Sequence, residues 1–115
     1  MNSFEFHTKI VGTTFIPKSQ ERISTLENGM TLTLKCEPEN KYDPNAVAVY
    51  TEDFKLGFIP KETAAKINLD VSDGAVHCVV SEVTVEGKGN AGCNIHLLVD
   101  RIEGCTVRSY LTVRS

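Results

Sequence analysis

Apolar and polar residues alternate with a period of two along much of this chain. Residues 30–37, MTLTLKCE, are the clearest case, with Met30, Leu32 and Leu34 on one face and threonines and charged residues on the other. A half-buried β-strand has this pattern, because successive side chains point to opposite faces of a sheet. We therefore expect six or seven short strands, within residues 4–12, 30–37, 45–51, 55–59, 75–86, 94–100 and 106–114.

The segment 75–86 changes phase along its length. Val76, Cys78 and Val80 share one face, whereas the valines after Ser81–Glu82 have the opposite parity. One extra residue near that dipeptide restores the register, which predicts a β-bulge of the kind found where a strand turns a barrel corner. The glycine-rich segment that follows, EGKGNAGC at 86–93, is interpreted as a hairpin loop.

Two segments have the pattern of short helices. Residues 17–29 begin with a proline and end at Asn28-Gly29, which are good start and stop signals. Residues 60–70 begin with Pro60 and carry Glu62 in the first turn, where a carboxylate complements the helix dipole. A mainly β chain with two short helices and one phase-shifted strand predicts a small barrel or a strongly bent sheet.

Length and composition indicate one domain. The chain has 115 residues and no low-complexity linker, so residues 1–115 are treated as a single unit with one core. Residues 1–12 lack the cationic start and apolar stretch of a signal peptide, and no segment approaches the roughly 20 apolar residues of a membrane helix. We expect a cytoplasmic protein with no membrane association.

Cysteines and histidines are scattered through the chain. There are 4 cysteines and 3 histidines, at positions 36, 78, 93 and 105 and at positions 7, 77 and 96. No two cysteines form a Cys-x-x-Cys pair, so the sequence gives little support for a zinc site and predicts reduced, structural thiols. We expect no metal and no other cofactor.

Neither charge nor local motifs point to a polyanion-binding enzyme. The formal net charge is −3, whereas proteins that hold duplex nucleic acid mainly by charge are usually basic. The loop at 86–93 lacks the Gly-Lys-Ser/Thr ending of a phosphate-binding loop, and no local catalytic motif is present. The alternative is acid–base or metal chemistry, for which Glu39 and Asp43 are the candidate carboxylate pair. We expect a non-catalytic protein.

The turn at 39–46, ENKYDPNA, carries more chemistry than a turn needs. Asp43 and Asn45 can bond to the backbone and Pro44 fixes its own φ, so one reading is a rigid connection with Tyr42 as a lid on the core. The other reading is a receptor: the carboxylate accepts from a hydroxyl and repels phosphate, and the ring stacks on a base. Lys35, Lys41 and Lys61 are the nearby cations in sequence, suited to a phosphate. Together these groups suit a terminal nucleotide.

Two segments in this region, CEPENKYDPNAVAVY and KLGFIPKETAAKI, resemble the HIRAN domain family. The resemblance covers about residues 8 to 100, and residues 101–115 are expected to add a further C-terminal strand. It implies a modified OB-like β-barrel with two helices. It also implies a non-catalytic module that captures single-stranded DNA by its 3′-hydroxyl end, working with a helicase or nuclease supplied by another protein.

The resemblance implies a role for each matching residue. Asp43 corresponds to the aspartate that accepts from the 3′-hydroxyl, and Asn40 to the asparagine that helps hold the end. Tyr42 corresponds to the aromatic residue against the terminal nucleotide, and Phe15 to an aromatic residue lining the same groove. Lys61 corresponds to a basic residue at the start of the second helix, suited to a backbone phosphate.

The chain departs from the DNA-binding eukaryotic pattern at four positions. Thr14 stands where that pattern has an arginine, and Phe58 where it has a histidine near the phosphate. Ile16 replaces a tyrosine, and Glu39 replaces an asparagine. Each lost charged contact costs on the order of 1 kcal/mol or more. The alternative is therefore a protein-interaction or assembly module on the same barrel, with an edge strand available for self-association.

Overall fold

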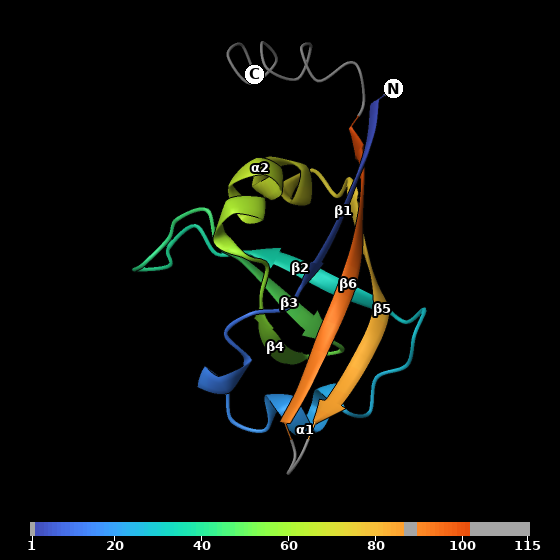
Figure 1. Ribbon diagram of the computed structural model, residues 1–115. Coiled ribbons are helices and arrows are strands. Elements are labelled where there is room, and N and C mark those ends of the chain that lie inside the picture. Colours follow the sequence, from blue (N-terminus) through green and yellow to red (C-terminus); the bar gives the residue numbers. More distant parts are fainter. Residues whose placement is uncertain (1, 87–89, 102–115) are drawn as a thin grey trace, which may run out of the picture.

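The computed structural model describes residues 2–86 and 90–101 of the chain (Figure 1). The predicted strand at 106–114, and with it the proposed C-terminal addition, lies outside the described residues. The elements in chain order are β1 (Asn2–Lys9), η1 (Thr13–Phe15), α1 (Ser19–Ile23), β2 (Thr31–Cys36), β3 (Val47–Thr51), β4 (Phe54–Phe58), α2 (Lys61–Ser72), β5 (Val76–Glu86) and β6 (Asn90–Arg101).

The described strands form one six-stranded sheet in the order β1-β6-β5-β2-β3-β4, and every neighbouring pair is antiparallel. The sheet curls, so that the long strands β1, β6 and β5 form one side of the molecule and β2, β3 and β4 cross the other (Figure 1). The expected mainly β, OB-like fold with two helices is therefore confirmed, and the six described strands form a curled half-barrel. Helix α2 covers one end of the curl and α1 lies at the other.

Backbone pairing between Val11, in the segment that follows β1, and strand β4 closes the curl. The Ile10 N–H still donates to the Cys93 carbonyl of β6, at 3.0 Å. One residue later, Val11 and Phe58 exchange both backbone hydrogen bonds, each at 2.8 Å. The chain thus leaves one edge of the sheet and pairs with the other, which brings the segment after β1 against β4.

Gly57 permits this close approach. A Cβ built at that position would lie 2.5 Å from the Val11 carbonyl oxygen and 2.7 Å from a methyl group of Ile10, closer than such atoms can come. The absence of a side chain at Gly57 thus lets the backbone of β4 approach the backbone at Val11.

The predicted bulge in β5 is present. The pairing of β5 with β6 shifts register between Val80 and Glu82. The shift lets Val83 pack against the core that Cys78 and Val80 enter before it. Strand β3 is buried on both faces, as its continuous apolar run predicts.

Two predicted boundaries are wrong. Helix α1 spans five residues rather than 17–29, because the Ser24 and Thr25 hydroxyls donate to the carbonyls of Glu21 and Arg22 and favour turns over further helix. The segment Asn90–Cys93 is strand rather than loop, since it pairs with Val83–Glu86 across the hairpin. Its small residues suit that position, because a Cβ on Gly92 would lie 3.1 Å from the Thr84 hydroxyl.

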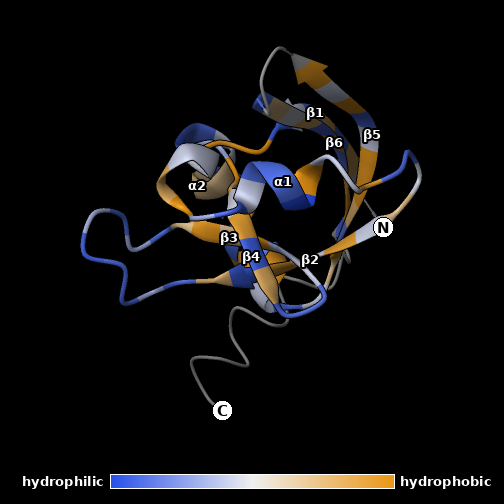
Figure 2. Ribbon diagram, turned by 90° about the horizontal axis from the view of Figure 1, so that it is seen from below, coloured by the Kyte–Doolittle hydropathy of each residue, from blue (hydrophilic) through white to orange (hydrophobic). Residues whose placement is uncertain are grey.

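Apolar side chains of both helices and five strands meet inside the curl. Figure 2 shows the hydrophobic residues along these strands and helices by colour. Cys78 and Cys93 belong to this core and are free thiols, as predicted. Burial raises the pKa of Cys78 to about 12, with a smaller contribution from Cys93, and burial raises the pKa of Cys93 to about 11. No helix in the described part of the chain is long and apolar enough to cross a membrane.

Replacing Gly57 with alanine is expected to lower the free energy of unfolding by about 2 kcal/mol or more, because the added methyl group forces β4 away from Val11. Urea denaturation measures the loss. Gly29→Ala is the control: its Cβ meets nothing within 4 Å, so only the strain of its positive φ of 91° is added. If both variants lose the same free energy of unfolding, the close approach of Gly57 to Val11 is not what makes the glycine necessary.

Candidate nucleic-acid interface

A groove of about 710 Å³ lies between the 37–46 loop, η1 and the start of α2. We call it the aromatic groove. Its lining residues are Val11, Phe15, Asn40, Tyr42, Asp43, Ala46, Phe58, Ile59 and Lys61. Six of the seven residues that the sequence nominated for DNA contact therefore share one cavity. The seventh, Thr14, lines an adjacent hollow together with Ile16 and Lys18.

Asn40 organises the loop that forms one wall of the groove. Its side-chain oxygen accepts the backbone N–H groups of Tyr42 and Asp43, at 2.8 and 3.1 Å. Its amide nitrogen donates to the Glu37 carboxylate at 3.0 Å. Most of the hydrogen-bonding capacity of Asn40 is thus used inside the loop, so its first role is to fix the positions of its neighbours rather than to contact a ligand.

Asp43 divides its carboxylate between the loop and the groove. One oxygen accepts the Asn45 backbone N–H at 2.9 Å, the capping interaction that the architectural reading predicts. Within residues 2–86 and 90–101, the other oxygen has no hydrogen-bond partner. Asp43 is half-buried and lines the groove, so this second oxygen is an acceptor held on a stiffened turn.

Three aromatic side chains border the groove. Tyr42 is 90% exposed and Phe15 is 87% exposed, so neither ring contributes to the core and the reading of Tyr42 as a core lid is wrong. Phe58 is half-buried, and the Lys55 ammonium lies 4.5 Å from its ring centroid. Exposed rings held on short, hydrogen-bonded segments are platforms for stacking by flat ligands.

Lys61 is the cation at the groove, at the first position of α2. The backbone N–H groups in this first turn have no partners within the helix until Ala64, which donates to the Pro60 carbonyl at 2.9 Å. An exposed lysine beside such a helix end suits an anion. Lys35 does not contribute, because its ammonium lies over the Tyr50 ring, 4.4 Å from the centroid.

Glu37 is held as a carboxylate at the base of the loop. Burial disfavours its charged form, but hydrogen bonds from Lys55 and Asn40 outweigh this effect and lower the pKa of Glu37 below its usual value. Lys55 therefore neutralises the charge of Glu37, whereas Glu39, two residues later, remains exposed.

Sequence reasoning missed the apolar floor of the groove and one of its supports. Val11 and Ile59 enter the lining only because the barrel closes at Val11 and Phe58. Asn45 ties the loop to α2, since its side-chain oxygen accepts from the Asn68 amide at 3.1 Å. Asn45 stands out in the sequence motif, but no local pattern indicates that its partner is Asn68, 23 residues later.

One family model and two solved structures match this chain. The family model described as the HIRAN domain matches residues 3–100. A Lactobacillus plantarum protein of known crystal structure aligns with a TM-score of 0.64 and 22% identity, covering 86% of this chain and 100% of its own. The HIRAN domain of human HLTF aligns with a TM-score of 0.62 and 18% identity, covering 83% of this chain and 74% of its own. No curated protein sequence matches the chain.

Removing the Asn40 side chain is expected to loosen the loop. In Asn40→Ala, the amides of Tyr42 and Asp43 lose their acceptor, and their hydrogen exchange should rise roughly fivefold, equivalent to about 1 kcal/mol. Exchange measured by NMR checks this, with Asn28→Ala, an exposed asparagine in the turn before β2, as the control. Unchanged exchange at both amides would mean that Pro44 and Asp43 hold the loop without Asn40.

Proposed function

This chain belongs to the HIRAN domain family, and on that premise we propose that its aromatic groove captures single-stranded DNA at a 3′-hydroxyl end. HIRAN domains are DNA-binding rather than catalytic domains. The chain then acts as a non-catalytic module in the cytoplasm, on ends that a helicase or nuclease partner processes. The aromatic groove is the surface on which this proposal rests.

One observation carries the proposal: the Asp43 oxygen that has no hydrogen-bond partner among the described residues belongs to a side chain that shares a cavity with two exposed aromatic rings. A carboxylate accepts a hydrogen bond from a sugar hydroxyl and repels a phosphate in the same place. Tyr42 and Phe15 offer flat apolar faces to the terminal bases. These preferences suit a strand that ends in the groove better than one that continues through it.

The phosphate that precedes the terminal sugar is assigned to the start of α2. Lys61, the first residue of α2, lines the same groove as Asp43, so a cation at a helix N-terminus and an acid belong to one site. A nucleotide lying between them has its hydroxyl near Asp43 and its 5′ phosphate near Lys61. This orientation gives the strand a defined polarity.

Three features favour the alternative of a protein-interaction module. The net charge is −3, and Thr14 and Phe58 supply no cation. The groove is also floored by apolar residues, which suit a peptide side chain. Binding that ignores the chemistry of the DNA end, or no DNA binding, would favour this alternative.

A labelled oligonucleotide with a 3′-hydroxyl is expected to bind at least about tenfold more tightly than the same strand with a 3′-phosphate, because one hydrogen bond to a charged acceptor is replaced by repulsion. Fluorescence anisotropy at low and moderate salt measures both affinities. Asp43→Asn should abolish the preference by restoring binding to the phosphate end.

Asp53→Asn is the matched control for this experiment. It removes the same charge from the exposed β3–β4 turn, in a separate hollow with Arg22 and Glu52. The end preference should be unchanged in this variant. A preference that survives Asp43→Asn, or that is lost in Asp53→Asn, contradicts the assignment of Asp43.

Tyr42→Ala is expected to weaken binding of the hydroxyl-ended strand about 5- to 150-fold, the equivalent of roughly 1–3 kcal/mol for one stacked base. The loss should appear at both salt concentrations, since stacking depends little on ionic strength. Tyr42→Phe retains the ring and should bind like the wild type. If both substitutions weaken binding equally, the hydroxyl rather than the ring makes the contact.

A further inference from the structure

A cluster of potential metal ligands lies on the outer face of β1 and β6. Antiparallel pairing of these strands places His7 directly opposite His96, and the two imidazole rings stack with centroids 4.3 Å apart and planes inclined by 6°. Glu5 lies two residues before His7 on the same strand, and hence on the same face. Each strand thus contributes to one small patch.

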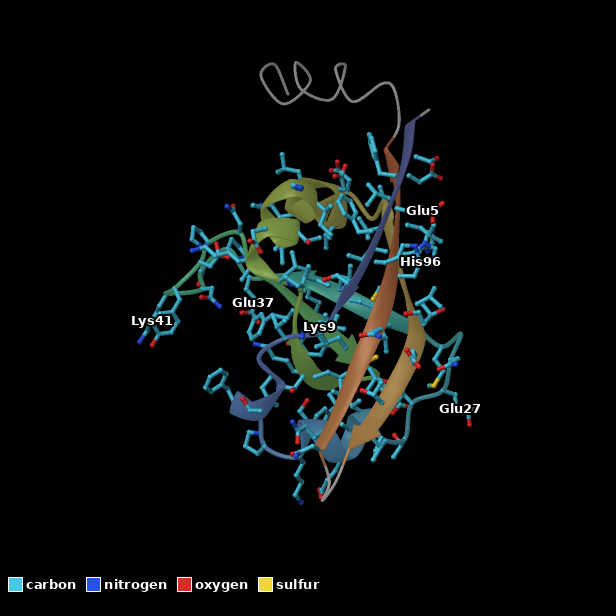
Figure 3. The ribbon with its side chains drawn as sticks, in the orientation of Figure 1. Glu5, Lys9, Glu27, Glu37, Lys41 and His96 are labelled. Carbon is cyan, nitrogen blue, oxygen red and sulfur yellow. The ribbon has the colours of Figure 1, made fainter. Side chains whose placement is uncertain are left out.

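The three side chains converge on one point. A Glu5 carboxylate oxygen lies 2.8 Å from Nε2 of His96 and 3.9 Å from Nε2 of His7. One ligand atom from each residue can be chosen so that all three lie within 4.8 Å of one another. Figure 3 labels Glu5 and His96, whose side chains meet beside β6.

We propose that Glu5, His7 and His96 form a binding site for zinc. Two imidazole nitrogens and one carboxylate are a ligand set that zinc uses when it keeps an open coordination position. Zinc–nitrogen bonds of about 2.0–2.1 Å place tetrahedral ligand atoms about 3.3 Å apart. The observed separations need side-chain rotations of roughly an ångström, and the partial exposure of all three groups leaves room for such rotations.

The position of the site suggests what bound zinc does. β1 is an edge strand of the described sheet and is joined laterally to β6 alone. A metal held by two residues of β1 and one of β6 adds a cross-link to that junction, and it stabilises the folded chain because the unfolded chain has no assembled site. The fourth ligand is supplied by solvent or by a second molecule that approaches the edge.

This site is independent of the aromatic groove. The two share no residue, and Figure 3 shows Glu5 and His96 on one side of the molecule and Lys41, from the 37–46 loop, on the other. Lys9, which follows His7 on the same face of β1, is the nearby cation that zinc must tolerate. Its long exposed side chain can turn away from the site.

Isothermal titration of the metal-stripped, reduced chain with zinc chloride tests the proposal. One zinc ion should bind per chain, and His7→Ala, His96→Ala and Glu5→Gln should each weaken binding about tenfold or more. At the same zinc concentration, the unfolding temperature should rise more in the wild type than in these variants. His77→Ala is the control, since His77 is an exposed histidine on β5 outside the cluster, and it should bind like the wild type.

Cobalt(II) substitution separates this site from thiol coordination. Cobalt bound by imidazole and carboxylate lacks the intense near-ultraviolet charge-transfer band that cobalt–thiolate bonds produce. Absence of this band, together with loss of cobalt binding in His96→Ala, supports the site. A thiolate band, wild-type affinity in the His7 and His96 variants, or weakened binding in His77→Ala would overturn it.

Discussion

The pair of backbone hydrogen bonds between Val11 and Phe58 is the constraint on which the rest of the architecture depends. It joins the two edges of the curled sheet, and it forms only because residue 57 has no side chain. This closure places η1 against β4 and brings Phe15 into the groove that Phe58 also lines. One close backbone contact inside the barrel therefore determines one wall of a groove on its surface.

The other wall is held by a different kind of interaction. The 37–46 loop buries little, so side-chain hydrogen bonds to its own backbone, from Asn40 and Asp43, replace the packing that fixes a strand. Asn45 then ties the loop to α2 through Asn68. This accounts for two asparagines in one turn: one shapes the loop and the other anchors it. A ligand that binds there pays less to order the site, because the chain has already ordered it.

Local periodicity was sufficient to predict the six described strands, the bulge in β5 and helix α2, because alternation and helix-start residues act within a few positions of the chain. Periodicity did not predict two element boundaries. The hydroxyls of Ser24 and Thr25 end α1 early, and pairing with β5 makes Asn90–Cys93 part of β6. Six of the seven residues that the resemblance singled out line one groove, whereas Thr14 lines another hollow. No pattern could join His7 to His96, since only the pairing of β1 with β6 makes them neighbours.

The acidity of the chain and the recognition of a DNA end are compatible on physical grounds. A protein that follows a continuous strand must neutralise many phosphates, and a net charge of −3 works against this. At a 3′ end the last sugar carries a hydroxyl instead of a phosphate, and there a carboxylate becomes an acceptor rather than a source of repulsion. Asp43 and Lys61 line one groove, so in the proposed function an internal stretch of strand would meet repulsion at Asp43 that a terminus would not. In the proposed function, the acid that weakens general affinity for DNA is therefore also the group that selects the end.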